Sequence, residues 1–321
     1  MKTTCLIVGL GQIGMQYDIN EASNKIIHTH SKAFSTHPRF KLIGAVDTDI
    51  SKCNEFSQKF KLPAHSEIPS CFGEESPDLV IISLPTERHF ESIKEIISLC
   101  KPKVILCEKP LSYSLKESKS ILDLCKKNHI ALFVNYMRRS DPGVLEIKKR
   151  IKLKDISYPM TGVVWYSGGF LNNGSHFFNL LEFFLGHFCD AEVISKPFDM
   201  KNGDFGINAQ VNFKNGKIYF LNLLDNSFSH HTLELISSSG RLRYDEGGKK
   251  IIWQSLNNHL VAKKLKVLNS LVEIIENDLD RYQWNVANQL ANYFIGKPYE
   301  LCSGDDALIT LKSMSQICES Y

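Results

Sequence analysis

The sequence lacks a long hydrophobic run, so it offers no candidate for a membrane-spanning helix. No stretch approaches the roughly 20 consecutive apolar residues that such a helix needs. The apolar segment at residues 5–8 is too short for the core of a secretory signal, and it leads into glycines typical of a turn. We therefore expect a cytoplasmic protein with no membrane partner.

Patterned cysteines and an excess of one charge are also missing. The nine cysteines occur singly, without the C-x-x-C spacing or the histidine partners of a zinc site, and without a disulfide pattern. The 38 basic and 35 acidic side chains give a net charge of +3, and both signs are interspersed. No basic face for nucleic acid results. We expect no metal and no nucleic-acid partner.

A glycine motif near the N-terminus is the most informative feature that is present. The apolar segment 5–8 runs directly into G-x-G-x-x-G at residues 9–14. In a dinucleotide-binding fold, Gly9 permits the tight turn, Gly11 lets the backbone approach the pyrophosphate, and Gly14 allows close packing of a helix on the strand. The phosphates then meet free N–H groups at a helix N-terminus. A glycine-bearing turn that binds no ligand is the alternative.

An acidic residue follows the second predicted strand, residues 40–46. Asp47 is suited to bind the ribose hydroxyls, and its charge disfavours a 2′-phosphate. No arginine follows it, so NAD is favoured and NADP is the alternative. The usual gap from the glycines to this acid is about 20 residues, whereas Gly14 and Asp47 are 33 apart. We interpret residues 15–24 as an insertion at the rim of the cofactor cleft and expect a helix near residues 29–36.

Strands and helices alternate over residues 1–135, which predicts a doubly wound parallel sheet, the Rossmann fold. Apolar runs at 79–84, 104–107 and 130–134 are typical of buried parallel strands, with amphipathic helices at 90–100 and 114–127. Because ligands bind at the carboxyl ends of such strands, the glycine motif, Asp47 and the segments 83–86 and 108–110 are expected to converge on one cleft.

The pattern changes after residue 140. Strand-like runs follow one another, and Asn215-Gly216 between two of them predicts a hairpin. The expected strands are residues 162–167, 191–194, 207–213, 217–224, 232–237 and 250–253. Helices are expected at 280–295 and 305–320, where they are candidates to pack back on the first domain. Residues 136–321 are thus predicted to form an α+β domain with a mostly antiparallel sheet, for substrate binding and oligomerisation.

Several segments resemble one family. Glu108-Lys109-Pro110 after a buried strand resembles the E-K-P signature of the Gfo/Idh/MocA oxidoreductases, the glucose–fructose oxidoreductase and inositol dehydrogenase group. Leu84-Pro85-Thr86 with His89 is similar to the family's cofactor half. Gly174-Ser175-His176 and the closing Gly304-Asp305-Asp306-Ala307-Leu308 are similar to its substrate half and last helix. The resemblance covers nearly the whole chain.

The resemblance implies two proton carriers. It places Lys109 between the nicotinamide and the substrate, where a cleft and a neighbouring cation favour a neutral amine. His176, at the start of an apolar helix, is the second carrier, with an ordinary structural hydrogen bond as its alternative role. The implied cofactor contacts are Gly9, Gly11, Gln12, Ile13, Gly14, Asp47, Leu84, Pro85, Thr86, His89, Glu108 and Lys109.

Two departures and two further residues concern the substrate. The family commonly has aspartates where this chain has Asn172 and Asn179, and asparagine orients by hydrogen bonds but carries no proton. We expect both to bind substrate hydroxyls. Tyr136 and Arg138 follow the last Rossmann strand, where an arginine suits a carboxylate or phosphate; a salt bridge at the domain boundary explains it equally well.

The predicted function is an NAD(P)-dependent oxidoreductase that acts on a CH–OH or keto carbon of a sugar, cyclitol or nucleotide-sugar derivative. A glycosidase that oxidises C3 transiently, and a non-catalytic NAD-binding protein, are the alternatives. The resemblance also implies a homodimer or homotetramer.

Overall fold

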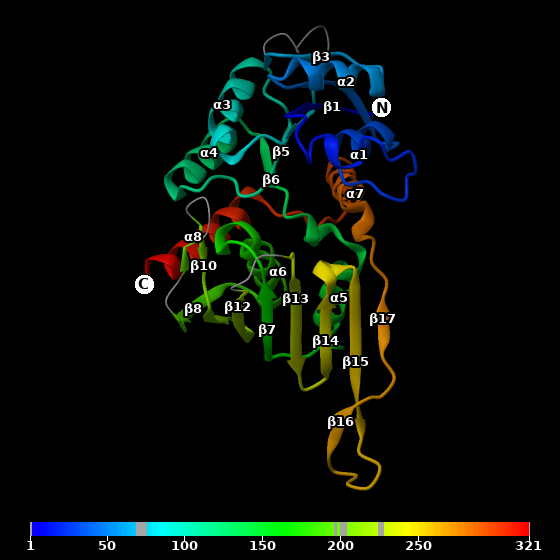
Figure 1. Ribbon diagram of the computed structural model, residues 1–321, viewed down its shortest axis with the longest axis vertical. Coiled ribbons are helices and arrows are strands. Elements are labelled where there is room, and N and C mark those ends of the chain that lie inside the picture. Colours follow the sequence, from blue (N-terminus) through cyan, green and yellow to red (C-terminus); the bar gives the residue numbers. More distant parts are fainter. Residues whose placement is uncertain (1, 69–75, 196–197, 200–203, 224–227, 321) are drawn as a thin grey trace. The chain divides into compact units, whose positions relative to one another are not determined.

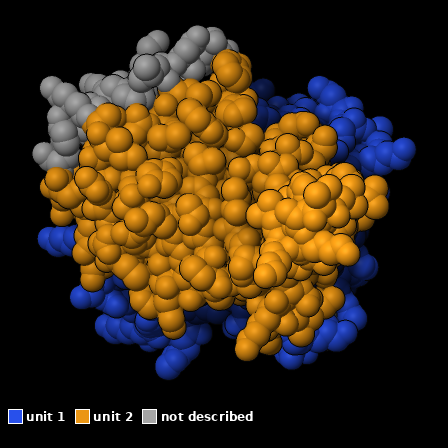
Figure 2. Space-filling model, turned by 90° about the horizontal axis from the view of Figure 1, so that it is seen from below, with its two compact units in different colours: residues 1–140, 280–309 blue, residues 141–279, 310–321 orange. Residues whose placement is uncertain are grey.

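The chain forms two compact units, each with its own sheet (Figures 1 and 2). The computed structural model describes residues 2–68, 76–195, 198–199, 204–223 and 228–320. Unit 1 comprises Met1–Ser140 and Asp280–Ile309, and unit 2 comprises Asp141–Leu279 and Thr310–Tyr321. The C-terminal part of the chain therefore contributes to both units.

Unit 1 contains a six-stranded parallel sheet in the order β3-β2-β1-β4-β5-β6. The order reverses between β1 and β4, which is the point where doubly wound sheets bind ligands. The strands β4 and β5 are buried along their whole length, as their uninterrupted apolar sequences predict. The bounds are β1 (Thr3–Val8), β2 (Phe40–Val46), β3 (Ala64–His65), β4 (Leu79–Ile82), β5 (Val104–Cys107) and β6 (Ala131–Val134).

Helices cover both faces of this sheet. On one face, α1 (His30–Thr36), α2 (Ile50–Phe60) and α7 (Tyr282–Phe294) share a core with the strands. On the other, α3 (His89–Leu99) and α4 (Leu115–Lys127) pack with the beginning of α8 (Gly304–Glu319). The expected Rossmann fold is therefore confirmed, and α7, far away in sequence, completes it.

Unit 2 contains a nine-stranded mixed sheet in the order β16-β15-β14-β13-β7-β12-β11-β8, with β17 paired to β15. All pairs are antiparallel except β7 with β12, and Asn215-Gly216 joins β11 to β12 as predicted. The expected end of that strand, Leu224, lies outside the described residues. The bounds are β7 (Met160–Tyr166), β8 (Phe188–Val193), β11 (Ala209–Phe213), β12 (Gly216–Asn222), β13 (His231–Ser237), β14 (Gly240–Asp245), β15 (Lys250–Asn258), β16 (Lys266–Leu268) and β17 (Glu273–Ile275), beside a separate pair, β9 (Phe198–Asp199) and β10 (Phe205–Gly206).

Among the described residues of unit 2, helices pack against one face of this sheet. The helices α5 (Pro142–Leu153) and α6 (Ser175–Leu185) and the end of α8 bury their apolar side chains there. On β7, Val164 and Tyr166 are fully buried, whereas Trp165 between them is 41% exposed. This alternation is the period of two expected for a sheet with one buried face.

Candidate cofactor and active site

The glycine loop of unit 1 lies where β1 and β4 separate, and two of its glycines are required by the backbone itself. Gly9 has φ +104°, and a Cβ there would lie 2.6 Å from the carbonyl oxygen of Ser83. A Cβ on Gly14 would lie 2.2 Å from the carbonyl oxygen of Gly9. Side chains at either position would collide with main chain, so the fold alone explains both glycines.

Gly11 is different. A Cβ at this position would meet nothing within 4 Å, and its φ lies outside the left-handed region. Packing therefore gives no reason for a glycine here, whereas close approach of the backbone to a pyrophosphate does. The loop thus fits the phosphates of a dinucleotide.

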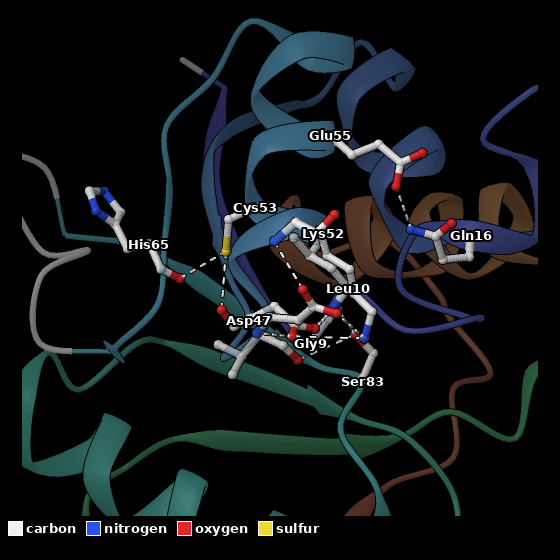
Figure 3. A network of polar contacts seen from close by, with 12 residues as sticks. Gly9, Leu10, Gln16, Asp47, Lys52, Cys53, Glu55, His65 and Ser83 are labelled. Atoms are coloured by element: carbon white, nitrogen blue, oxygen red, sulfur yellow. Dashed lines mark hydrogen bonds and ion pairs between the residues drawn. The ribbon is translucent and has the colours of Figure 1, made fainter.

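Asp47 ends β2 beside this loop (Figure 3). Its Oδ2 accepts a hydrogen bond from the Leu10 amide at 2.7 Å, and its Oδ1 accepts one from the Asp49 amide at 2.9 Å. Each carboxylate oxygen keeps a further lone pair for a ribose hydroxyl. The Lys52 ammonium lies 3.9 Å from Oδ1 and forms an ion pair with Asp47. Among the described residues, no other lysine pairs with this carboxylate.

The unusual spacing between the glycines and Asp47 has a simple structural cause. The amides of His30 and Ser31 donate to the carbonyls of Ile13 and Gly14. In an uninterrupted helix the donors would be residues 17 and 18, so thirteen residues are looped out of one helix. Without them, the distance from Gly14 to Asp47 falls from 33 to 20, the usual value.

The looped-out segment is held by buried polar contacts. The Asp18 carboxylate accepts hydrogen bonds from the amides of His28 and Thr29 and from the Thr29 hydroxyl at 2.6–3.1 Å. The Lys32 ammonium donates to the carbonyls of Glu21 and Ser23. Where the segment begins, Gln16 reaches Glu55 of α2 at 2.8 Å, next to the Asp47 network (Figure 3). The segment therefore borders the glycine loop, as an insertion at the rim would.

The loop after β4 carries Leu84, Pro85 and Thr86 and leads into α3. His89 is fully buried, and its ring nitrogens lie 3.0 and 3.2 Å from the carbonyl oxygens of Leu84 and Leu111. It therefore ties this loop to the segment after β5, and it presents no free ring nitrogen to a ligand.

The E-K-P segment follows β5, and the peptide between Lys109 and Pro110 is cis. The Glu108 carboxylate accepts hydrogen bonds from His30 at 2.8 Å and from Asn135 at 2.7 Å. Burial alone would raise the pKa of Glu108, but the hydrogen bond from His30, followed by the other polar neighbours, lowers it on balance. His30 was not predicted from the sequence. It follows Gly14 by 16 residues in the chain, but its amide bonds to Ile13 as the third residue after Gly14 would in a helix.

Residues after β6 lie near α7. Tyr136 is buried, and Arg139 pairs with Asp306 at 3.1 Å within unit 1. Burial, followed by the negative charges of Glu108 and its neighbours, raises the pKa of Tyr282, whereas Arg138 lowers it. Arg138 therefore lies in the electrostatic range of Tyr282 on the same side of unit 1 as Glu108.

His176 lies in unit 2, half-buried at the start of α6. The preceding π-helical turn, Phe170–Gly174, continues into α6. The Asp204 carboxylate caps this turn, because it accepts hydrogen bonds from the amides of Leu171 and Asn172 at 3.0 and 2.9 Å. Asn172 is exposed, as a substrate ligand would be.

Asn179, three residues after His176, has different surroundings. It is 1% exposed, and its amide donates to the Thr310 hydroxyl at 2.9 Å, which in turn donates to Glu182 at 2.5 Å. Asn179 therefore links α6 to α8 in the core of unit 2. A substrate contact for it remains a prediction.

No group of three His, Cys, Asp or Glu side chains suited to a metal ion occurs in the described ranges. No described helix is long and apolar enough to cross a membrane.

Burial raises the pKa of Cys100 to about 11 and that of Cys125 to about 12, so both thiols stay protonated at neutral pH.

Comparisons with known proteins agree with this geometry. Residues 3–136 match the GFO_IDH_MocA family, described as an oxidoreductase family with an NAD-binding Rossmann fold. The chain is 26% identical over 224 residues to a scyllo-inositol 2-dehydrogenase (NAD(+)) of Bacillus subtilis, covering 63% of this chain and 61% of that one. It is 25% identical over 266 residues to a myo-inositol 2-dehydrogenase of Thermotoga maritima, covering 74% of each.

A solved structure shares the whole fold. The WlbA dehydrogenase from Bordetella pertussis, crystallised with NADH and UDP-GlcNAcA, superposes with a TM-score of 0.73 at 15% identity, covering 100% of this chain and 96% of that one. At this identity the likeness concerns the fold alone. The alignment to the Bacillus protein spans less than two thirds of that protein's length.

Proposed function

We propose that the chain is a member of the Gfo/Idh/MocA oxidoreductase family, which its residues 3–136 match, and that it is an NAD-dependent dehydrogenase or reductase. Its substrate would be a sugar, cyclitol or nucleotide-sugar derivative, oxidised or reduced at a CH–OH or keto carbon. The observation that carries the proposal is Gly11, a glycine that packing does not require, in a loop at the switch point of the sheet. NADP is the alternative cofactor.

The two parts of the chain would divide the work. Residues 1–135 would bind the cofactor, and residues 136–321 would bind the substrate. The cofactor contacts would include Gln12 and Ile13 of the glycine loop, together with Thr86 and Glu108. A bound nicotinamide supplies the hydride acceptor or donor. Lys109 would move the proton of the reacting hydroxyl, and His176 would hold or exchange it.

Tyr136, Arg138 and Asn172 would bind the remaining hydroxyl or acidic groups of the substrate. Arg138 suits a substrate acid group, since guanidinium binds carboxylate or phosphate in a bidentate manner. Asn172 accepts and donates hydrogen bonds but carries no proton. Proton transfer would therefore depend on Lys109 and His176 alone.

A non-catalytic NAD-binding protein is the second candidate. It is favoured by the two asparagines where the family commonly has aspartates, since one of these, Asn179, is buried against Thr310. It predicts normal cofactor binding without turnover of any sugar or cyclitol. A glycosidase would release a sugar without net reduction of NAD⁺.

We also propose a cytoplasmic homodimer or homotetramer. The support is the sheet face of unit 2 opposite its helices, where Trp165 and Ile236 are 41% and 49% exposed. Large apolar side chains gathered on one surface are typical of association sites.

The first test is a titration with NADH and NADPH, followed by nicotinamide fluorescence, of the wild type and Asp47→Ala. We expect tight NADH binding that the substitution weakens about tenfold, since a charged hydrogen-bond partner of the ribose is lost. Binding of neither nucleotide would overturn the proposal. Product analysis with cyclitols, uronic acids and UDP-sugars would then separate the dehydrogenase from both alternatives.

A further inference from the structure

A buried polar cluster lies behind the E-K-P segment, and Glu108 is its only member that has a part in the function proposed so far. It joins His30 of α1, Glu108 after β5, Asn135 after β6 and Gln283 of α7. Asn135 Nδ2 lies 2.7 Å from Glu108 Oε1 and 3.2 Å from Gln283 Oε1. His30 and Gln283 are fully buried and Asn135 is 4% exposed. His30 and Asn135 therefore bind the Glu108 carboxylate directly, and Gln283 joins the cluster through Asn135.

Stability alone is a poor explanation for this cluster. The buried atoms His30 Nδ1, Asn135 Oδ1 and Gln283 Nε2 have no hydrogen-bond partner among the described residues. An incompletely satisfied buried network costs free energy that apolar side chains of similar size would not. Clusters of this kind are most often retained at functional sites.

The cluster acts on the residue next to Glu108. The Lys109 amide lies 3.4 Å from Glu108 Oε2, and the charge of Lys109 is one of the influences that lower the pKa of Glu108. The groups that face Glu108 are His30 from α1, Cys107 and Lys109 from the β5 segment, and Tyr282 from α7. The hydrogen bond from His30 is the strongest of those that lower the pKa. The orientation and charge of Glu108 therefore depend first on His30.

We propose that His30 is a positioning residue, which fixes the Glu108 carboxylate and thereby the place and charge of Lys109. The inference rests on the proposed function, because that function makes Lys109 the proton carrier. The amides of His30 and Ser31 also donate to the carbonyls of Ile13 and Gly14, so the start of α1 is bonded to the glycine loop. His30 would then couple the phosphate loop to the E-K-P segment.

The experiment compares His30→Leu and His30→Gln with the matched control His37→Gln. His37 follows the same helix, is also buried, and its Nε2 lies 2.9 Å from Asn288 Oδ1, away from Glu108. We expect His30→Leu to lower kcat about 10²-fold with NADH affinity unchanged. The acid limb of the pH profile of kcat should move to higher pH, because Glu108 takes up a proton more readily. His30→Gln, which keeps an N–H donor, should restore most of kcat. A kcat of His30→Leu equal to that of His37→Gln would overturn the proposal, as would a loss in His30→Gln as large as that in His30→Leu.

A second readout does not depend on turnover. Reaction of Lys109 with an amine-directed reagent is followed over a pH series by mass spectrometry of the folded protein, whose fold is checked by circular dichroism. When His30 no longer holds the Glu108 carboxylate beside Lys109, the ammonium loses part of a neighbouring negative charge. Lys109 should therefore react at lower pH in His30→Leu, by about half a pH unit or more, and at an unchanged pH in His37→Gln. An unaltered profile in His30→Leu would refute the role of His30. If the wild type turns over no substrate, the proposed function fails and this labelling still decides the inference.

Discussion

In unit 1 the candidate cofactor residues lie on loops that backbone contacts shape, whereas in unit 2 a side chain shapes the turn before His176. Gly9 and Gly14 are fixed by carbonyl groups less than 3 Å from any added Cβ. The turn before His176 is fixed instead by the Asp204 carboxylate. A loop that the backbone shapes suits a ligand that stays the same. A turn that a side chain shapes can take another form when that side chain is replaced.

The largest expected effect comes from replacing Lys109, the proposed proton carrier, which lies in unit 1. Lys109→Met should reduce kcat by about 10²- to 10⁴-fold, the usual share of general acid–base catalysis. NADH affinity should change little, because the loop around Gly11 is untouched. Steady-state kinetics and fluorescence titration measure the two effects. A variant that keeps wild-type turnover would remove Lys109 from the mechanism.

A pair of alanine substitutions separates the fold from the ligand within one loop. Gly9→Ala should lower the free energy of unfolding by about 2–4 kcal/mol, because it combines a positive φ with a collision against Ser83. Gly11→Ala should leave the free energy of unfolding nearly unchanged and weaken NADH binding about tenfold. Urea denaturation and titration measure both. If Gly11→Ala bound NADH like the wild type, the phosphate-loop interpretation would be wrong.

The corresponding test in unit 2 removes a side chain. Asp204→Ala should lower the free energy of unfolding by about 1–2 kcal/mol, since two turn amides lose their cap. It should also lower kcat, because the turn that carries Asn172 and leads to His176 loosens. Asp190→Ala, on β8 with one exposed hydrogen bond to Asn212, is the control. Equal kcat in both variants would show that the cap does not position the turn.

The smallest expected effect concerns an ion pair at the far side of unit 2. The Arg150 guanidinium donates to both carboxylate oxygens of Glu273 at 2.8 and 2.6 Å, and this bond lowers the pKa of Glu273. A lowered folded-state pKa gives stability that is present above the ordinary glutamate value and is lost as the pH falls through the folded value. Arg150→Lys should lower the free energy of unfolding at pH 7 by less than about 1 kcal/mol, and the difference should shrink as the pH falls below the ordinary glutamate value. A difference that grows on acidification would contradict the assignment.

Much of unit 1 was predictable from local sequence. Buried parallel strands appear as uninterrupted apolar runs, and the carboxyl ends of β1, β2, β4 and β5 brought Gly9, Asp47 and Glu108 to one edge of the sheet, as expected. The strands β14, β16 and β17 of unit 2 were not predicted. Strands that are half exposed carry mixed polar and apolar sequences, as in Gly240–Asp245, and their pattern is weaker.

The sequence by itself determined the Rossmann sheet, the glycine loop, Asp47 and the E-K-P segment, because each depends on residues that are neighbours in the chain or on a strand order that chain handedness dictates. Only the tertiary structure decided that thirteen residues are looped out of the first helix, that His30 thereby reaches Glu108, and that Asn179 faces Thr310. These contacts join residues 78 and 131 positions apart. Hydrogen bonds over such separations leave no periodic trace in a single sequence, since packing of whole elements brings the partners together.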